Sequence, residues 1–311
     1  KEINIVSISD TADKTNLIYL LKYDSIYGKL NAEILETELG ISVNGKEIIF
    51  NSWKNADEAK WGELKTDIVI LATGKPKTKK EVDDHLSKGC KKVIVASTPN
   101  NFKDIQIYVP GANDNNINFQ SNVFSLGSNT ANAVAPLLKI LNEQVGVERA
   151  FLTTVHGYSN SNRLADVAGE GFRLNRAAGE NIIPSITKSS DVIAHVLPFL
   201  EKKIASSSMT VPIPDGSTVD LTVDIKKKSS IEEINTIIEN STKDSLKNII
   251  DITYDPIVSS DVIRSTMSGL VDGLATMEIN NKKIKLIIWF DNGWGYAARI
   301  IDTIKKFGQV M

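Results

Sequence analysis

The chain has 311 residues, enough for two domains, and its hydrophobic fraction of 41% and charged fraction of 24% are those of an ordinary globular protein. Its 36 Lys and Arg against 38 Asp and Glu leave a formal net charge of -2, which does not favour a nucleic-acid binder. One cysteine excludes an internal disulfide, three scattered histidines argue against a metal site, and no apolar run is long enough to span a membrane. We therefore expect a soluble, cytoplasmic protein with no metal, no nucleic-acid partner and no membrane insertion.

The first part of the chain alternates strand and helix patterns. Residues 2–8 read as a strand, and residues 17–21 have the apolar spacing of a short helix. Asn44-Gly45 between apolar flanks predicts a tight hairpin turn. A strand, a helix and another strand then follow in the order typical of a parallel α/β unit. They are predicted at 67–72, 79–88 and 92–96.

The pattern changes in the second part. Residues 131–144 form an amphipathic helix with 128–130 at its N-terminal turn. Beyond residue 149, runs of β-branched and aromatic residues predict strands that form a mostly antiparallel sheet. The expected strands are 151–156, 219–224 and 284–290, with a polar loop at 159–176 and helices at 231–240 and from 261 onward.

Several segments resemble one known family, in the family's order and over essentially the whole chain. They include Trp61-Gly62-Glu63-Leu64, Thr153-Thr154-Val155-His156-Gly157-Tyr158, Asn181-Ile182-Ile183-Pro184-Ser185 and Trp289-Phe290-Asp291-Asn292-Gly293-Trp294-Gly295-Tyr296. With these motifs the chain resembles the phosphorylating glyceraldehyde-3-phosphate dehydrogenases.

The resemblance implies an α/β fold of two domains. Residues 1–128 and 293–311 would form an NAD-binding-type domain, a truncated doubly wound parallel sheet (Rossmann-like) that lacks its first strand and helix. Residues 129–292 would form the family's catalytic-type α+β domain. The family's first strand lies between the strands that end here at Asp10 and Thr73, so we expect both to have an unpaired edge. A preceding segment, a partner chain or a rearranged sheet would fill that position.

The family's nucleophile is a cysteine at a helix N-terminus in Ser-Cys-Thr-Thr-Asn, activated by a histidine. The matching segment here is Ser128-Asn129-Thr130-Ala131-Asn132, so Asn129 stands at the nucleophile position. A carboxamide offers no thiolate, and Cys90 lies in the other predicted domain. The resemblance puts His156 at the position of the base, where it is either a vestigial base or a hydrogen-bonded residue at a strand end.

The phosphate-binding residues also depart from the family. Its Phe-Arg-Val-Pro segment corresponds to Met209-Thr210-Val211-Pro212, so Thr210 replaces the arginine that would grip a phosphate with two hydrogen bonds. Hydroxyl side chains remain at the other matching positions, either as vestigial phosphate contacts or as loop and helix-cap residues. They are Ser128, Thr130, Ser159 and Thr187.

The cofactor positions are the least complete. The family's Gly-x-Gly-x-x-Gly turn, which lets a pyrophosphate approach a helix N-terminus, occurs nowhere in the sequence. Positions that match cofactor contacts remain, each with an alternative structural role as a strand end or turn. They are Asp10, Thr73, Gly74, Ser97, Asn292 and Tyr296. We expect no bound cofactor, and NAD if there is one.

These losses together favour a catalytically inactive homologue of glyceraldehyde-3-phosphate dehydrogenase that serves as a structural or interaction subunit of an assembly. Two alternatives stay open: a nucleotide-binding sensor without chemistry, and an active NAD-dependent aldehyde-phosphate dehydrogenase with a non-standard site. We expect a homo-oligomer or a hetero-complex, because the second sheet and the 159–176 loop make subunit contacts in the family that the chain resembles.

Overall fold

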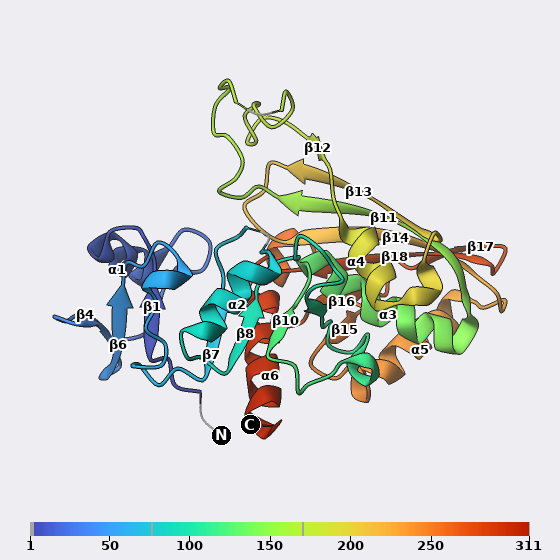
Figure 1. Ribbon diagram of the computed structural model, residues 1–311. Helices are drawn as coiled ribbons and strands as arrows, with labels where there is room; N and C mark the ends of the chain where they lie inside the picture. The colour runs from blue at the N-terminus through green and yellow to red at the C-terminus, as the bar shows by residue number, and fades with distance from the viewer. Residues whose placement is uncertain (1–2, 76, 170, 311) are drawn as a thin grey trace. The chain divides into compact units, whose positions relative to one another are not determined.

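The computed structural model describes residues 3–75, 77–169 and 171–310. The chain divides into two compact units, whose elements are labelled in Figure 1. The first consists of Lys1–Gln106, Asn118–Ser125 and Asp302–Met311, and the second of Ile107–Ile117 and Leu126–Ile301. The C-terminal helix α6 (Trp294–Val310) contributes residues to both.

The first unit begins with a four-stranded sheet in the order β1-β6-β5-β4. Its strands are β1 (Ser7–Ser9), β4 (Ile34–Glu36), β5 (Gly40–Val43) and β6 (Lys46–Asn51). The predicted hairpin turn at Asn44-Gly45 is confirmed, because both residues have positive φ and join the antiparallel pair β5 and β6. The helix expected over 17–21 is also present as part of α1 (Lys14–Lys22), and a small β2 (Tyr23–Asp24) and β3 (Gly28–Lys29) ribbon follows it.

The second sheet of this unit is parallel at its centre and has the order β7-β8-β10-β9. Its strands are β7 (Ile68–Leu71), β8 (Lys92–Val95), β9 (Gln106–Ile107) and β10 (Val123–Ser125). The predicted helix between the first two is α2 (Lys79–Ser87), which Thr78 and Glu81 begin with a reciprocal capping box. Because Val82 on α2 packs into the same core as Val93 and Val95 of β8, the expected parallel α/β unit is confirmed.

Strands β1 and β7 each have one hydrogen-bonded neighbour among the described residues, β6 and β8 respectively. Ile8 of β1 and Ile70 of β7 are exposed large apolar side chains. The strand expected over 2–8 is shorter than predicted, and Glu2 lies outside the described residues. Pairing with β6 begins only at the Val6 carbonyl, so residues 3–5 have no ladder to hold them extended.

The second unit is built on one mixed sheet in the order β12-β13-β11-β14-β18-β16-β15, with β17 beside β18 (Figure 1). Strands β14 (Ser217–Ile225) and β18 (Lys283–Phe290) are direct antiparallel neighbours, so the strands predicted at 219–224 and 284–290 lie in one sheet. The other strands are β11 (Val147–Gly157), β12 (Ile183–Ser185), β13 (Ile204–Val211), β15 (Ile250–Thr253), β16 (Gly269–Asp272) and β17 (Met277–Ile279). The predicted fold class is therefore confirmed.

One face of this sheet is covered by α3 (Asn129–Val145), α4 (Ser189–Val196) and α5 (Ile231–Lys243). Along β14 and β18 the residues alternate between buried and half-buried, so the inner row packs under the helices and the outer row faces away. Short 3-10 turns occur at Ala56–Glu58, Asp114–Asn116, Pro198–Leu200 and Ser259–Val262.

The helix expected from residue 261 onward is wrong. The chain makes only the 3-10 turn Ser259–Val262 there and then continues irregularly to β16. Arg264 has a positive φ of 71°, which no α-helix accommodates, and its backbone N–H donates to the Asp291 carboxylate at 2.8 Å. A long-range hydrogen bond thus replaces the helical one.

Candidate functional site

Asn129 is the first residue of α3. Ser128 caps this helix, since its Oγ accepts a hydrogen bond from the Ala131 N–H at 3.1 Å. The Asn129 side-chain amide donates to the backbone carbonyl of Asn292, in the turn between β18 and α6. The amide therefore ties the N-terminus of α3 to that turn.

His156 lies near the end of β11 and is largely buried. Its Nδ1 lies 3.1 Å from the Ser217 Oγ, and its ring packs edge-on against Phe290 with the centroids 5.9 Å apart. Burial lowers the pKa of His156, so the imidazole is neutral around pH 7. A neutral imidazole has one nitrogen with a free lone pair, which is what a base or hydrogen-bond acceptor requires.

Ser217 connects His156 to Asn292, and through Asn292 to Asn129. Its Oγ accepts from the Gly157 N–H at 3.3 Å, contacts the His156 ring, and donates to the side-chain oxygen of Asn292. A continuous path therefore runs from Asn129 through Asn292 and Ser217 to His156.

Sequence reasoning did not single out Ser217. Its position follows from Asp215-Gly216, because Gly216 has a φ of 82° and a Cβ there would lie 1.9 Å from the Ser259 carbonyl oxygen. Asp215 accepts from the Asn292 backbone N–H at 3.0 Å and so fixes the same turn. The sequence signal that could have identified Ser217 is the Asp215-Gly216 turn directly before β14.

Tyr296 lies on the first turn of α6 and is half-buried. Its hydroxyl donates to the Gly127 carbonyl at 3.0 Å, and burial raises its pKa above the ordinary range. Both residues that the resemblance assigned to nicotinamide contact, Asn292 and Tyr296, thus make hydrogen bonds within the second unit.

The remaining predicted phosphate contacts are either buried in the second unit or hydrogen-bonded to residues close by in sequence. Thr210 is buried and lies directly opposite His156 in the pairing of β13 with β11. The Thr187 hydroxyl lies 2.8 Å from that of Ser189 and accepts its backbone N–H at the start of α4. Ser159 is bonded to Ser161 and Asn162 within its loop, and Thr130 is buried in α3.

The other cofactor candidates belong to the first unit. Asp10 accepts from the Ala12 N–H at 2.8 Å, and the Ser97 hydroxyl donates to the Lys75 carbonyl at 3.1 Å. Thr73 and Gly74 are exposed after β7, and Gly74 has a φ of 70° with open space where a Cβ would stand. Gly74 therefore leaves room for a ligand, but no described residue here supplies the turn of backbone amides that a pyrophosphate requires. The described residues fit NAD only in part.

Cys90 does not replace the missing thiol. It is buried in the first unit, its Sγ donates to the His85 carbonyl at 3.3 Å, and burial raises its pKa to about 11. Among the described residues, no group of three or more His, Cys, Asp or Glu could hold a metal ion. None of the helices in the described ranges is long and apolar enough to cross a membrane.

Comparison with known proteins first gives the class of protein. Residues 128–292 match the family described as glyceraldehyde 3-phosphate dehydrogenase, C-terminal domain, and residues 1–79 match the corresponding NAD binding domain. The chain thus combines an NAD-binding Rossmann-type domain with a dehydrogenase-type second domain.

Relatives along the whole chain give the particular family. The glyceraldehyde-3-phosphate dehydrogenase of Geobacillus stearothermophilus is 38% identical over 302 residues, which are 97% of this chain and 90% of the relative. Glyceraldehyde-3-phosphate dehydrogenase 2 of Streptomyces avermitilis is 39% identical over 309 residues, covering 99% and 92%, and that of Bacillus subtilis is 35% identical over 311 residues, covering 100% and 91%. The chain belongs to the glyceraldehyde-3-phosphate dehydrogenase family, as the motifs predicted.

Proposed function

We propose that this chain is a catalytically inactive member of its family and serves as a structural or interaction subunit of an assembly. The observation that carries the proposal is Asn129 at the start of α3, with its amide bonded to the Asn292 carbonyl. The side chain at the nucleophile position is a hydrogen-bonding link, and the thiolate on which the family's covalent chemistry depends is missing.

The hydrogen bonds of Asn292 and Tyr296, at positions that match cofactor contacts in the family, also support a catalytically inactive chain. The Asn292 side chain accepts from Ser217, and the Tyr296 hydroxyl donates to Gly127. These groups stabilise the second unit itself. NAD is the cofactor that the matched NAD binding domain implies, and we propose that it has no role in turnover here.

The loss of the phosphate-binding arginine is a second, separate change. Thr210 is a buried hydroxyl without a charge, so it cannot replace a bidentate guanidinium contact. The two losses, of the thiol at residue 129 and of the arginine at residue 210, support relaxed selection on catalysis better than a single compensated substitution. We keep the predicted domain limits, 1–128 with 293–311 and 129–292, as part of this proposal.

The test is a turnover assay with glyceraldehyde 3-phosphate, NAD and inorganic phosphate. We expect no activity above background from the wild-type chain or from Asn129→Cys. Removal of a covalent nucleophile costs several orders of magnitude in rate, and one restored thiol does not restore phosphate or cofactor binding. Turnover near that of an active relative, from either protein, would refute the proposal.

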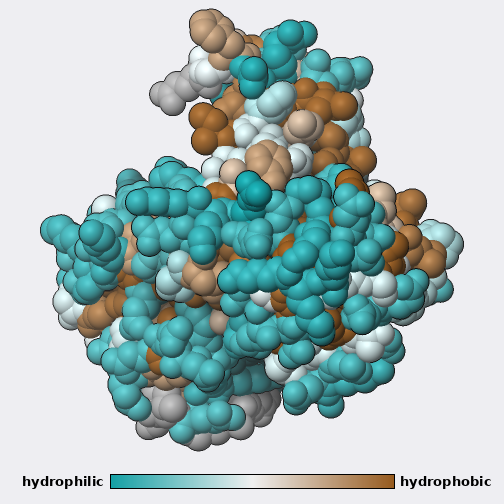
Figure 2. Space-filling view, turned by 90° about the vertical axis from the view of Figure 1, so that its right-hand side faces the viewer, coloured by the Kyte–Doolittle hydropathy of each residue, from teal (hydrophilic) through white to brown (hydrophobic). Residues whose placement is uncertain are grey.

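A subunit role is supported by apolar side chains that the chain leaves exposed. Leu164, Phe172 and Ile186 are almost completely exposed in the segment between β11 and β12 and just after it. Figure 2 shows apolar side chains at the top of the view, where Figure 1 shows this segment of the second unit. Exposed apolar clusters of this kind mark interaction surfaces, and we propose that they contact another subunit, identical or different.

One observation favours the nucleotide-binding sensor as a second candidate. Residues 1–79 match the NAD binding domain of the family, and Gly74 leaves open space after β7. Equilibrium dialysis of the chain with NAD separates the two: retention of NAD without turnover favours the sensor, and no retention favours the structural subunit.

A further inference from the structure

The two sheets of the first unit are joined by the stretch of chain between β6, which ends at Asn51, and β7, which begins at Ile68. Its middle part, residues 53–61, contains the 3-10 turn Ala56–Glu58 and packs against α2. Trp61 belongs to the buried core that α2, β7 and β8 share, and Trp53 packs against that core. The attachment of residues 53–61 to α2 therefore determines how firmly the connection between the two sheets is held.

A side-chain hydrogen bond fixes Trp61 to α2. Its indole Nε1–H donates to Nδ1 of His85 at 3.1 Å, and the centroids of the two rings lie 6.0 Å apart. Trp61 is buried, so an indole N–H that loses its acceptor there costs free energy. The ring of Trp53 stands edge-on to that of Trp61 with the centroids 4.8 Å apart, so the position of Trp53 depends on Trp61.

This hydrogen bond requires a neutral imidazole. An indole N–H can only donate, so Nδ1 of His85 must have a free lone pair, and the hydrogen of the neutral ring is then on Nε2. Protonation places a hydrogen on both ring nitrogens, and turning the ring over does not restore an acceptor. Two N–H groups would then face each other across the 3.1 Å contact. The bond is therefore lost whenever His85 is charged.

The charged groups on and just before α2 leave this ring neutral at pH 7. Burial, and then the ammonium group of Lys77, lower the pKa of His85, and the carboxylates of Asp84 and Glu81 oppose them. Since the pKa is lowered in the folded protein, the stability that neutral His85 contributes is fully present above about pH 6.5. It is lost as the pH falls below that value, so the hydrogen bond breaks on acidification.

The elements packed against α2 do not hold a charge that would stabilise a protonated His85. Cys90 donates from its Sγ to the His85 carbonyl, and burial raises the pKa of this thiol to about 11, so it is uncharged. The charged groups of the connecting stretch interact with other partners. These pairs are Asp57 with Lys80, Glu58 with the backbone N–H of Lys54, and Lys60 with Glu63.

The end of the connecting stretch next to Trp61 has a second attachment, which does not titrate. The Gly62 N–H donates to the Lys88 carbonyl at 2.9 Å. A Cβ at Gly89 would lie 2.7 Å from the Cα of Gly62, so the two backbones are in direct contact. This attachment is unaffected by the charge on His85, and Gly62 therefore stays in place when Trp61 is released.

We propose that Trp61 and His85 form a pH-sensitive latch: protonation of His85 releases Trp61 and Trp53 from α2, and residues 53–61 then move outward about Gly62. The released segment loosens the connection between the two sheets of the first unit. The latch responds to protons and requires neither NAD nor catalysis, so it does not depend on the function proposed above.

Amide hydrogen exchange between pH 5 and pH 8, read by mass spectrometry and corrected for the intrinsic effect of pH on exchange, tests the latch in the whole chain. Between pH 7.5 and pH 5 the protection of residues 53–61 falls by about tenfold, as the loss of one hydrogen bond implies. Residues 92–95 of β8, which are buried, keep their protection because the unit stays folded. In NMR spectra the Trp61 indole N–H signal, identified by its loss in Trp61→Phe, moves with a midpoint below pH 6.5.

His85→Gln separates the charge from the hydrogen bond. Its side-chain oxygen can accept from Trp61 but takes up no proton, so residues 53–61 stay protected at pH 5. The matched control is His156→Gln, the same substitution in the second unit, which leaves the transition of residues 53–61 unchanged.

Constant protection of residues 53–61 in the wild type, a Trp61 indole signal that does not move, or an equal loss of protection in His85→Gln overturns the proposal. An equal loss at residues 92–95 also overturns it, because acid then unfolds the whole unit. The indole signal of the wild type decides the matter even where a variant does not fold.

Discussion

The Oγ of Ser217 lies 3.1 Å from Nδ1 of His156 and donates its own hydrogen to the side-chain oxygen of Asn292. Since that hydrogen is used, the contact with the ring requires His156 to donate from Nδ1. The imidazole is then the Nδ1–H tautomer, and its Nε2 has the free lone pair. A histidine oriented in this way remains although the side chain at the nucleophile position is a carboxamide.

The tautomer can be observed directly. We expect the ¹⁵N chemical shifts of His156 to show a protonated Nδ1 and an unprotonated Nε2 near pH 7, and Ser217→Ala to abolish that preference. Ser217→Thr, which keeps a hydroxyl, should retain it. A protonated Nε2 in the wild type would mean that the Asn292 amide is turned over and that the chain of hydrogen bonds runs in the opposite direction.

The pH dependence of stability follows from the same histidine. Burial lowers the pKa of His156 below its usual value of 6.5, so the unfolded chain binds the proton more readily than the folded one. The contribution of neutral His156 is therefore fully present above about pH 6.5 and is lost as the pH falls below it. Urea unfolding between pH 5 and pH 8 measures this, and His156→Gln should flatten the dependence; an unchanged slope would contradict it.

A thiol introduced at the start of α3 should be reactive. In Asn129→Cys the helix N-terminus favours the thiolate, whereas the pKa of Cys90 is raised to about 11 by burial. We expect an added disulfide reagent to modify Cys at residue 129 before Cys90 in this variant. The same variant with Cys90→Ala, in which residue 129 carries the one remaining thiol, should react in the same way. Modification rates followed against pH give the thiol pKa, and a value at or above that of a free cysteine would disagree with this geometry.

Tyr296→Phe tests whether the presumed nicotinamide contact now stabilises the fold. Removing the hydroxyl leaves the Gly127 carbonyl without its donor, which costs about 1 kcal/mol of unfolding free energy. Tyr254→Phe is the control, since Tyr254 is half-exposed and its hydroxyl forms no hydrogen bond with another described residue. Chemical denaturation compares the two, and equal stabilities would contradict the assigned role.

Lys92 is a buried cation whose role is structural. Its ammonium group donates to the Phe119 and Ser121 carbonyls at 3.1 and 2.7 Å and lies 5.0 Å from the centre of the Phe307 ring. Lys92→Met should lower the unfolding free energy by about 1–3 kcal/mol because both carbonyls lose a donor. The neighbouring Lys91 forms an exposed ion pair with Asp67, so Lys91→Met should change little. The two variants are compared by urea unfolding.

Self-association tests the proposed subunit role. Sedimentation at micromolar concentration should show an assembly, and Phe172→Ser with Ile186→Ser should shift it toward the monomer, because both side chains are almost completely exposed. Leu20→Ser with Tyr19→Ser on α1, also exposed, serves as the comparison. A stable wild-type monomer without any partner would refute the homo-oligomer, leaving the hetero-complex.

The sequence by itself determined the family, the order of the elements and the missing thiol. Motifs such as Thr153-Thr154-Val155-His156 depend on residue identity, and the hairpin at Asn44-Gly45 depends on local chemistry, so neither requires knowledge of distant contacts. The helix expected from residue 261 failed for the opposite reason. A hydrogen bond from Arg264 to Asp291, 27 residues away, overrides the local preference.

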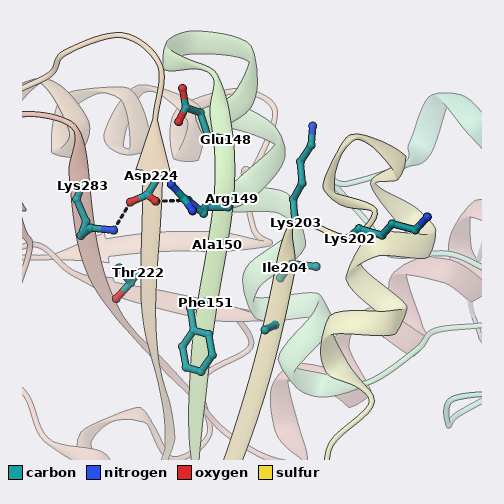
Figure 3. A pocket seen from close by; sticks show the side chains of 11 residues that line it. Glu148, Arg149, Ala150, Phe151, Lys202, Lys203, Ile204, Thr222, Asp224 and Lys283 are labelled. Carbon is teal, nitrogen blue, oxygen red and sulfur yellow. Dashed lines mark hydrogen bonds and ion pairs between the residues drawn. The ribbon is translucent and has the colours of Figure 1, made fainter.

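Only the tertiary structure decided what the retained residues contact. Ser217 became part of the site because the turn at Gly216 and the pairing of β11 with β14 bring it to His156. The net charge of -2 did not predict the group of cations around Arg149 (Figure 3), because the net charge of a chain does not say which charged residues lie side by side in the fold. Strand register places Lys203, Arg149 and Lys283 in one row, and register is set by which faces are buried, a property of the whole sheet.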